Sequence, residues 1–454
     1  MKIGKMSWVR HRAHAPGSQM KLTFWGTRGS IARAGPETRR FGGNTSCVSL
    51  ESAAGTQIVL DCGTGGYGLA RSLMANNHGK RGHLLFGHTH WDHIQGLPFF
   101  SPLFAPGNDW DIYGPRGIGR TTRDLLAGQM QYDYFPVELD ELAAAVRYHD
   151  LVEGSFDIDD IKVTAQYLNH PSLTLAYRLE VDGITVVYST DHEPRSALLA
   201  LGKRVPAAGE DERHARFLEG ADLLIHDAQY LAEEYEEKRG WGHSTVEYVV
   251  DTAEAVGVKN LALFHHDPAR DDDDISAIEV AAQTRLRTGS RTAVFAAAEG
   301  HTIEMESAQP ASSPRVHQMS AFSVPALSAS SCSFLTHIPQ AEEGRFVAAA
   351  LEAEGLSHTR LRATTDVARQ LDQVRPTAVL LSWVGPETLD LAKKISQTRS
   401  RQPAPLILVI AKTEEEMLVT EGLGAGIRDY FFLPTSNSYI RTWLRSWILR
   451  LSNG

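Results

Sequence analysis

The hydrophobic pattern of this chain changes character once along its length. Between about residues 20 and 306, short apolar runs typical of buried strands alternate with turns and with segments of helical periodicity. The clearest runs are 21–26, 56–61, 83–88, 184–189, 221–226 and 260–265. Because strands of such a sheet deliver their ends to one edge, the pattern predicts an α/β domain with its functional residues at that edge.

A more regular pattern begins near residue 331. Apolar runs that are each followed by an amphipathic helical segment predict a smaller parallel sheet with helices on both faces. These runs are 333–338, 377–383, 405–411 and 429–434. Residues 307–330 are rich in Ser, Ala and Pro without a period, and we interpret them as a linker between domains at 20–306 and 331–454.

The composition narrows the setting and the partners. The sequence contains no run of 18 or more apolar residues, so no membrane span is predicted. Residues 1–19 are basic and lack the apolar core of a secretion signal, so we predict a disordered arm, unless translation starts at Met20. The three cysteines form neither a disulfide framework nor a CxxC pattern, which favours a cytoplasmic location. The net charge of −10 argues against extended nucleic-acid binding, which needs a basic surface.

The stretch HTHWDH, residues 88–93, concentrates three histidines and one aspartate in six positions. Farther along, His170, Asp191 and His265 each follow an apolar run closely. Imidazole and carboxylate ligands suit zinc, manganese or iron, and the absence of cysteine argues against a closed structural zinc site. The pattern therefore predicts a metal site, and scattered surface or core histidines are the less favoured alternative.

This ordered set of residues resembles the metallo-β-lactamase superfamily over about residues 20–306. The resemblance implies an αββα sandwich that holds two divalent ions about 3.5–4 Å apart, Zn²⁺ most simply, with Mn²⁺ or Fe²⁺ as alternatives. The implied ligands are His88, His90 and His170 for one ion and Asp92, His93 and His265 for the other, with Asp191 bridging. His266 stays open as an alternative to His265, which we prefer because it ends its strand directly.

Two further motifs resemble the branch of ribonuclease Z-like phosphodiesterases. LLIHDAQY (223–230) is similar to its HEAT motif, with Asp227 in place of Glu, and GHST (242–245) is similar to its HST motif. The resemblance implies catalytic roles for Asp92, for His243 and for Asp227, which would orient the His243 ring. We also predict that Arg28, in GTRGS, contacts the substrate and that Asp61 supports the metal ligands through hydrogen bonds.

The surroundings of His243 agree with phosphate chemistry. Ser244 and Glu247 have the spacing of a capping box, followed by an apolar helical stripe. His243 is therefore predicted just before a helix N-terminus, where backbone N–H groups favour a phosphate. Asp227 would hold the ring and keep it protonated. A histidine without a catalytic role remains the alternative.

Residues 331–454 resemble a response-regulator receiver domain, a doubly wound, flavodoxin-like parallel sheet. Ser382 stands where such domains carry the phosphorylated aspartate, Leu433 stands where they carry a lysine, and Pro339 and Gln340 replace the acidic pair. Without these carboxylates, Mg²⁺ binding and acyl-phosphate chemistry are not expected. We predict a module that mediates homodimerisation, binds a protein partner or regulates the first domain; an inert stabilising appendage stays open.

Three functions are compatible with these features. We favour a two-metal phosphodiesterase that cleaves a small substrate, such as a cyclic nucleotide or cyclic phosphate, through a metal-bridging hydroxide. A ribonuclease Z-like RNA endonuclease is the first alternative, although residues 117–160 lack the long basic Gly/Pro-rich arm of such enzymes. A signalling adaptor that acts through the second domain is the other alternative, but the complete ligand set speaks against it.

Overall fold

The computed structural model describes most of both predicted domains. The described residues are 19–76, 78–117, 119–306, 332–361, 364, 367–398, 405–412, 415, 423, 426–433 and 436–451. The predicted linker, 307–330, and all but the last residue of the predicted arm, 1–19, lie outside these residues. Among the described helices, none combines the length and the apolar character needed to cross a membrane.

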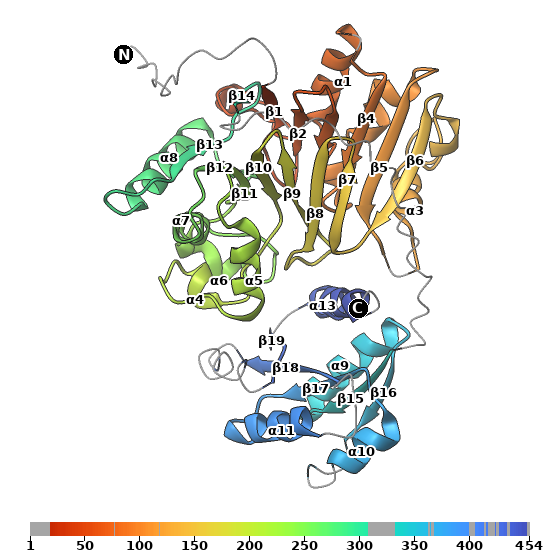
Figure 1. Cartoon of the computed structure of the whole chain (residues 1–454), viewed down its shortest axis with the longest axis vertical. Coiled ribbons are helices and arrows are strands. Elements are labelled where there is room, and N and C mark those ends of the chain that lie inside the picture. Colours follow the sequence, from red (N-terminus) through yellow and green to blue (C-terminus); the bar gives the residue numbers. More distant parts are fainter. Residues whose placement is uncertain are drawn as a thin grey trace.

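Two mixed sheets face each other in the first domain (Figure 1). Within the described residues, the first sheet has the order β14-β1-β2-β3-β4-β5-β6 and the second has the order β13-β12-β11-β10-β9-β8-β7. The strands of the first sheet are β1 (Met20–Gly26), β2 (Cys47–Glu51), β3 (Gln57–Leu60), β4 (Arg81–Leu85), β5 (Asp109–Pro115), β6 (Ala145–Leu151) and β14 (Thr302–Met305). Those of the second are β7 (Gly154–Ile158), β8 (Ile161–Tyr167), β9 (Leu175–Val181), β10 (Ile184–Ser189), β11 (Leu223–Asp227), β12 (Asn260–Phe264) and β13 (Ala293–Ala296).

Helices cover the outer face of each sheet and complete an αββα sandwich. They are α1 (Gly66–Ala75), α2 (Trp91–Ile94), α3 (Thr122–Gln129), α4 (Ala197–Ala200), α5 (Gly209–Leu218), α6 (Tyr235–Lys238), α7 (Val246–Ala255) and α8 (Asp272–Arg285). The main core lies between the sheets, where Phe24 and Leu85 of the first sheet share a cluster with Tyr177 and Val186 of the second. A separate core joins the second sheet to α7, through residues such as Val250. The predicted α/β sandwich is confirmed.

Each sheet is parallel in one half. Strands β3, β4, β5 and β6 pair in parallel with one another, and so do β10, β11, β12 and β13. The carboxyl ends of parallel strands meet at one edge, where open α/β sheets place their functional residues. This edge is where the predicted ligands after β4, β10 and β12 emerge.

The second domain is a fully parallel sheet of order β16-β15-β17-β18-β19 within the described residues. Its elements are β15 (Ser333–His337), α9 (Ala341–Ala353), β16 (Ser357–Arg360), α10 (Val367–Val374), β17 (Ala378–Ser382), α11 (Pro386–Gln397), β18 (Leu406–Lys412), β19 (Asp429–Leu433) and α13 (Asn437–Leu451). This strand order is the one that doubly wound, flavodoxin-like folds adopt. The predicted parallel sheet is confirmed.

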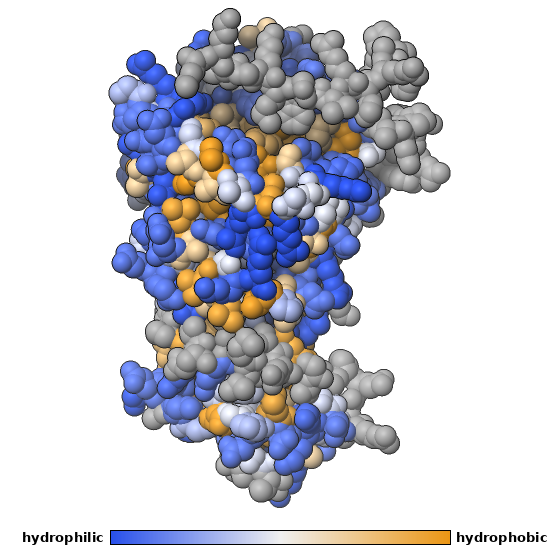
Figure 2. Space-filling view, turned by 90° about the vertical axis from the view of Figure 1, so that its left-hand side faces the viewer, coloured by the Kyte–Doolittle hydropathy of each residue, from blue (hydrophilic) through white to orange (hydrophobic). Residues whose placement is uncertain are grey.

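Helix α13 lies between the two domains (Figure 1). Its residue Leu449 belongs to the main core of the first domain, while Trp443 and Trp447 pack into the core of the second. The partly buried Arg450 forms ion pairs with Glu153 and Glu210 of the first domain, at 3.2 and 2.9 Å. The face shown in Figure 2 mixes apolar and strongly polar residues across the middle of the molecule. The domains are therefore joined by packing and ion pairs.

Candidate metal centre

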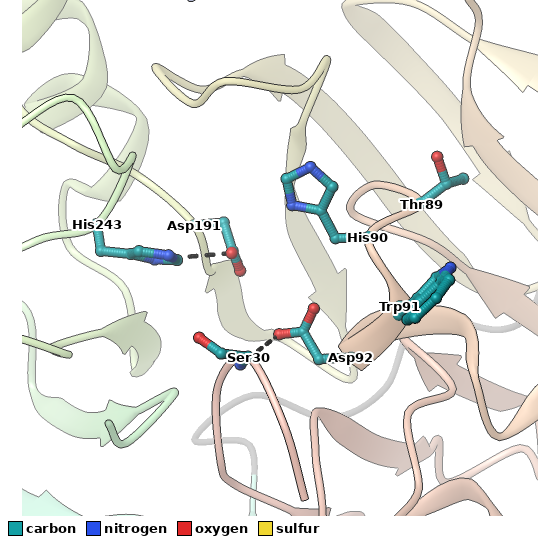
Figure 3. Close-up of a pocket in the computed structure, with 7 residues that line it drawn as sticks. All are labelled: Ser30, Thr89, His90, Trp91, Asp92, Asp191 and His243. Carbon is teal, nitrogen blue, oxygen red and sulfur yellow. Dashed lines mark hydrogen bonds and ion pairs between the residues drawn. The ribbon is translucent and has the colours of Figure 1, made fainter. Parts of the chain in front are cut away.

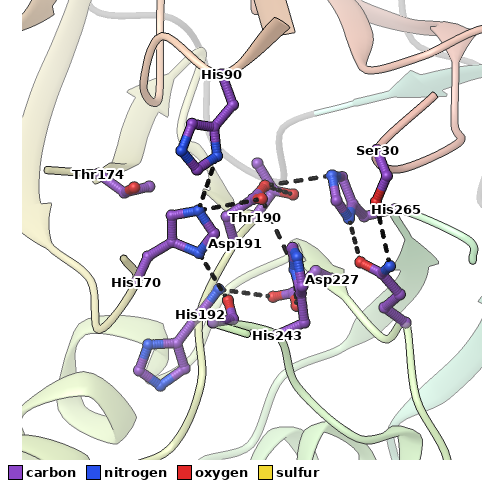
Figure 4. A network of polar contacts seen from close by, with 12 residues as sticks. Ser30, His90, His170, Thr174, Thr190, Asp191, His192, Asp227, His243 and His265 are labelled. Carbon is purple, nitrogen blue, oxygen red and sulfur yellow. Dashed lines mark hydrogen bonds and ion pairs between the residues drawn. The ribbon is translucent and has the colours of Figure 1, made fainter. Parts of the chain in front are cut away.

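Strand ends deliver the predicted ligands to one place between the two sheets. His88 follows β4 closely, His170 follows β8, and Asp191 and His265 follow β10 and β12. Asp92 and His93 come from α2, the short helix directly after His90. In Figure 4, side chains from these separate segments converge on Asp191.

The local backbone is unusual at this edge. Within the described residues, seven non-glycine residues have a positive φ, and four of them lie here: Ser30, Asp61, Asp191 and His265. Such conformations cost about 1–3 kcal/mol each and persist where the surrounding structure enforces them, often at functional sites. The chain therefore accepts local strain to place these side chains.

Two groups of three side chains have the spacing of metal ligands. Ligand atoms of His88, His90 and His170 lie within 4.8 Å of one another, as do those of Asp92, His93 and His265. In the second group, Asp92 Oδ2 lies 3.2 Å from His93 Nε2 and 3.1 Å from His265 Nε2. The structure thus brings together the two ligand sets that the sequence predicts.

The carboxylate of Asp191 divides its two oxygens between these groups. Oδ1 lies 3.9 Å from His88 Nε2 and 3.8 Å from His170 Nε2. Oδ2 lies 3.2 Å from His93 Nε2 and 3.5 Å from His265 Nε2. A carboxylate in this position can bridge two ions.

The donor set fits a metal because several buried ring nitrogens form no hydrogen bond with good geometry to any described residue. Within the described part of the chain, no hydrogen-bond partner is found for either ring nitrogen of His88 or for His93 Nε2. Buried polar atoms without partners are rare and call for an explanation such as an ion. Burial also lowers the pKa of His170 to about 3, which keeps this ring neutral and able to coordinate.

His93 behaves differently without an ion. Burial alone would lower its pKa, but the carboxylates of Asp92, Asp191 and Asp61 outweigh burial and raise the pKa well above the usual value. Three carboxylates around one ring therefore favour positive charge at this point. A metal ion bound to this ring would supply such a charge.

Hydrogen bonds behind the ligands fix their ring orientations. Asp61 is fully buried and accepts from Gly87 N–H, from Tyr188 Oη and from His93 Nδ1, each at 2.7 Å. His265 Nδ1 lies 3.0 Å from Gln229 Oε1. In these two rings, the bond at Nδ1 leaves Nε2 facing the centre, an arrangement typical of metal sites.

His243 lies at the edge of the same centre. Its Nδ1 is 3.6 Å from Asp227 Oδ2 and 3.7 Å from Asp191 Oδ1, and it forms a potential metal group with His170 and Asp191. Burial would lower the pKa of His243, but Asp227 and Asp191 outweigh burial and raise it. A role for this residue as a ligand was not foreseen from the sequence.

Asp227 also shapes the backbone beside His243. Its two oxygens accept from Ser244 N–H, at 2.8 Å, and from His192 N–H, at 3.2 Å. Helix α7 begins one residue later than the sequence predicted: Thr245 is its N-cap and accepts from Tyr248 N–H. The predicted capping box of Ser244 and Glu247 is therefore wrong, because these side chains instead bind His192 O and Ala232 N–H.

Arg28 makes contacts that the sequence did not predict. Its side chain is fully buried, and the guanidinium donates to the carbonyl oxygens of Gly42, Asp267 and Arg270. The predicted substrate contact of Arg28 stays a prediction, because the contacts seen here are with carbonyl groups of the protein's own backbone. Through these contacts Arg28 holds together the loops on which the site depends.

Ser30, two residues after Arg28, reaches the site. Its backbone N–H donates to Asp92 Oδ2 at 2.7 Å, and its φ of 64° lies in the left-handed region. Sequence reasoning missed this residue, although the small residues of GTRGS permit such a close approach. The geometry favours His265 over its neighbour, because His266 Nε2 binds Ala297 O whereas His265 lies in the cluster with Asp92 and His93.

A cavity of about 460 Å³ opens beside the centre. Its lining residues are Ser30, Thr89, His90, Trp91, Asp92, Asp191 and His243 (Figure 3). Trp91 and His243 lie on opposite sides in this view, and Trp91 is 77% exposed. The cavity therefore combines candidate metal ligands with His243, whose pKa is raised, and with the exposed ring of Trp91.

Comparison with known proteins agrees with this geometry. Residues 56–266 match the family model described as a beta-lactamase superfamily domain. The first domain has the metallo-β-lactamase fold. Ribonuclease Z of Brevibacillus brevis is 26% identical over 295 residues, which cover 56% of this chain and 87% of that protein. Ribonuclease Z of Haloarcula marismortui is 26% identical over 290 residues, with 54% and 86% covered. The prediction of a metal-dependent hydrolase is confirmed as a class of enzyme, without its substrate.

Solved structures are similar to parts of this chain. The metallo-beta-lactamase fold protein YhfI from Bacillus subtilis is 19% identical, covers 63% of this chain and 100% of its own, and has a TM-score of 0.46. Human tRNase Z, short form, is 21% identical, with 62% and 98% covered and a TM-score of 0.41. A two-component response regulator from Clostridium difficile is 15% identical, with 26% and 98% covered and a TM-score of 0.24.

The second domain places Ser382 at the end of β17, with neighbours that the sequence only partly predicted. Ser382 Oγ lies 3.1 Å from Gln340 Oε1 and 3.2 Å from Glu343 Oε2. The carboxylate of Glu343 therefore lies beside Ser382, although the resemblance had led us to expect no carboxylate at this place. Within the described residues, no group with metal-ligand spacing is found in this domain.

Proposed function

We propose that the chain is a two-metal phosphodiesterase that acts on a small phosphodiester. The observation that carries the proposal is the position of Asp191, whose two oxygens face two separate ligand groups beside the cavity. His88, His90 and His170 would hold one ion, and Asp92, His93 and His265 the other. Two divalent ions held by these residues would activate water and neutralise the charge of the phosphate group.

The protein's own groups would bind and orient the substrate. Ser30 N–H fixes Asp92 from one side of the cavity, and the carboxylates near His243 raise its pKa, which favours the protonated form of the ring. From this position His243 would donate a hydrogen bond, and then the proton, to the leaving oxygen. Trp91 forms an apolar wall for the part of the substrate that leaves.

The size of the cavity and the charge of the chain support a small substrate. A volume of about 460 Å³ is large enough for a nucleotide-sized ligand. The net charge of −10 offers no broad basic surface for RNA. The relatives named ribonuclease Z favour a second candidate, cleavage of a structured RNA at the same centre.

One panel of substrates tests both candidates. Turnover of bis(p-nitrophenyl) phosphate, of 2′,3′- and 3′,5′-cyclic nucleotides and of a precursor tRNA should be measured together with bound metal. The proposal expects turnover of at least one cyclic nucleotide and none of the precursor. Cleavage of the precursor alone would establish the RNA candidate instead. Bound metal without any phosphodiester turnover would contradict both.

A further inference from the structure

Helix α13 of the second domain contacts the segment that carries His170. The hydroxyl of Thr442 donates to the carbonyl oxygen of Pro171 at 2.7 Å, and Pro171 directly follows the candidate ligand His170. Thr442 is buried, with 6% of its surface exposed. The contact therefore fixes the backbone one residue away from the centre.

The same helix reaches a buried carboxylate, Glu193, two residues after Asp191. Tyr439 Oη donates to Glu193 Oε2 at 3.5 Å. On the side of the first domain, Glu193 accepts from Gly240 N–H, from Gly242 N–H and from Tyr235 Oη, at 2.8–2.9 Å. Glu193 thus receives donors from both domains.

Gly242 connects Glu193 to the metal centre. Its carbonyl oxygen lies 2.9 Å from His170 Nδ1, and His243 is the next residue. Its φ is +87°, and a Cβ atom there would lie 2.2 Å from His170 Nδ1. A shift of Gly242 would therefore move both the ring of His170 and the backbone of His243.

The loop that carries Glu193 is tied to the loop that carries His170. Glu193 N–H donates to Asn169 O at 2.9 Å, and Asn169 Nδ2 donates to Glu193 O at 2.7 Å. The Thr442 contact to Pro171 and the Tyr439 contact to Glu193 therefore act on one connected unit. Asp191, two residues before Glu193, belongs to the same unit.

We infer that Glu193 is a positioning residue for the metal centre and that α13 completes its support through Tyr439 and Thr442. The second domain is then part of the hydrolase site, because it sets the orientation of His170 and of the loop that ends in His243. Partners of metal ligands tune affinity and activity by about 10–100-fold when they are lost. The inference about turnover rests on the proposed function, whereas the inference about metal affinity does not.

Glu193→Gln in the full-length protein tests the positioning role of this carboxylate. A glutamine has one acceptor oxygen in place of two. Its NH₂ group would therefore face a backbone N–H group or a tyrosine hydroxyl group that donates a hydrogen bond to the carboxylate in the wild-type protein. We expect Zn²⁺ affinity, measured in competition with a chromophoric chelator, to fall by about 10–100-fold. Glu254→Gln is the control: Glu254 accepts from Arg287 N–H at 2.8 Å, at the end of α7 away from His243, and its loss should leave affinity unchanged.

Thr442→Val tests the contribution of the second domain with a milder change. Loss of one hydrogen bond predicts about two- to tenfold weaker Zn²⁺ binding. Thr442→Ser keeps the hydroxyl and should restore wild-type affinity. Thr292→Val is the matched control, because Thr292 is 7% exposed and its hydroxyl donates to Val258 O at the same 2.7 Å, at the opposite ends of the strands.

The outcomes separate positioning from stability. The inference expects Glu193→Gln and Thr442→Val to weaken Zn²⁺ binding while both controls lower only the melting temperature. Wild-type Zn²⁺ affinity in both site variants would overturn it, and so would equal weakening in the Thr292→Val control. If the wild-type protein binds Zn²⁺ but cleaves no phosphodiester, the proposed function fails and the affinity comparison still decides this inference.

Discussion

Replacement of Asp61 by asparagine should weaken metal binding although Asp61 is not itself a candidate ligand. Its Oδ1 accepts from Gly87 N–H, and its Oδ2 accepts from Tyr188 Oη and from His93 Nδ1. An asparagine that keeps the Gly87 bond turns its NH₂ group toward His93. His93 Nδ1 must then accept a hydrogen bond, and the ring proton moves to Nε2, the atom that faces the metal.

The magnitude follows from the bond that is lost. An ion can bind to Nε2 of His93 only when the ring proton is on Nδ1. In the variant, this Nδ1–H group would face the NH₂ group of the introduced amide, so two donors would meet and the hydrogen bond between the two side chains would be lost. A hydrogen bond to a charged group contributes about 1.5–3 kcal/mol. At 1.4 kcal/mol for each tenfold change, the ion bound by His93 should be held about 10- to 150-fold more weakly.

Isothermal titration of the metal-free variant with Zn²⁺ measures this effect. We expect one ion of the pair to bind as in the wild-type protein and the other to bind more weakly by that factor. Asp111→Asn is the matched control, because Asp111 is 4% exposed and accepts from a histidine, His149 Nε2, at 2.7 Å, in a network on β5 and β6. Wild-type affinity for both ions in Asp61→Asn would refute the reasoning.

Three further predictions concern other parts of the first domain. His243→Gln should lower turnover by about 10²–10⁴-fold while two metal ions remain bound, as general acids of this kind contribute that much; unchanged turnover with both ions bound would exclude the proposed role. Arg28→Gln should lower the melting temperature by several degrees, since three backbone carbonyl groups lose a donor, and should leave the KM of the folded enzyme unchanged; a raised KM with unchanged stability would support the substrate contact instead. Burial alone would raise the pKa of Asp111, but hydrogen bonds from His149 and Arg147 outweigh burial and hold it below its usual range. This carboxylate therefore stabilises the fold above its unfolded pKa of about 4, and the stability is lost as pH falls. The difference in urea midpoint between wild type and Asp111→Asn should shrink from pH 6 to pH 3, and a constant difference would contradict the assignment.

The sequence indicated candidate ligands that the structure brings together, because their chemistry and their place in the pattern agree. His88, Asp191 and His265 are residues of metal-binding type at the ends of apolar runs, and strand ends meet at one edge whatever the details of packing. The choice of His265 over His266 followed from the same rule, since the residue that ends the strand points to the edge.

Features that depend on contacts between distant segments could not be predicted in the same way. Arg28 has the charge of a substrate-binding residue, and only the burial of its loop against Asp267 and Arg270 reveals another role. Nothing local marks Glu193 either, because its donors come from Gly240, Gly242 and the second domain. The position of α13 against the first domain likewise depends on contacts between residues that are far apart in the sequence.

The most direct test of a two-metal phosphodiesterase is a titration of the metal-free protein with Zn²⁺, followed by turnover of bis(p-nitrophenyl) phosphate at each step. We expect turnover to rise until two equivalents are bound, and we expect Asp191→Ala to bind fewer ions and to show no turnover, because its two oxygens face both ligand groups. Full turnover without metal, or an Asp191→Ala variant that retains two ions and wild-type turnover, would contradict the account.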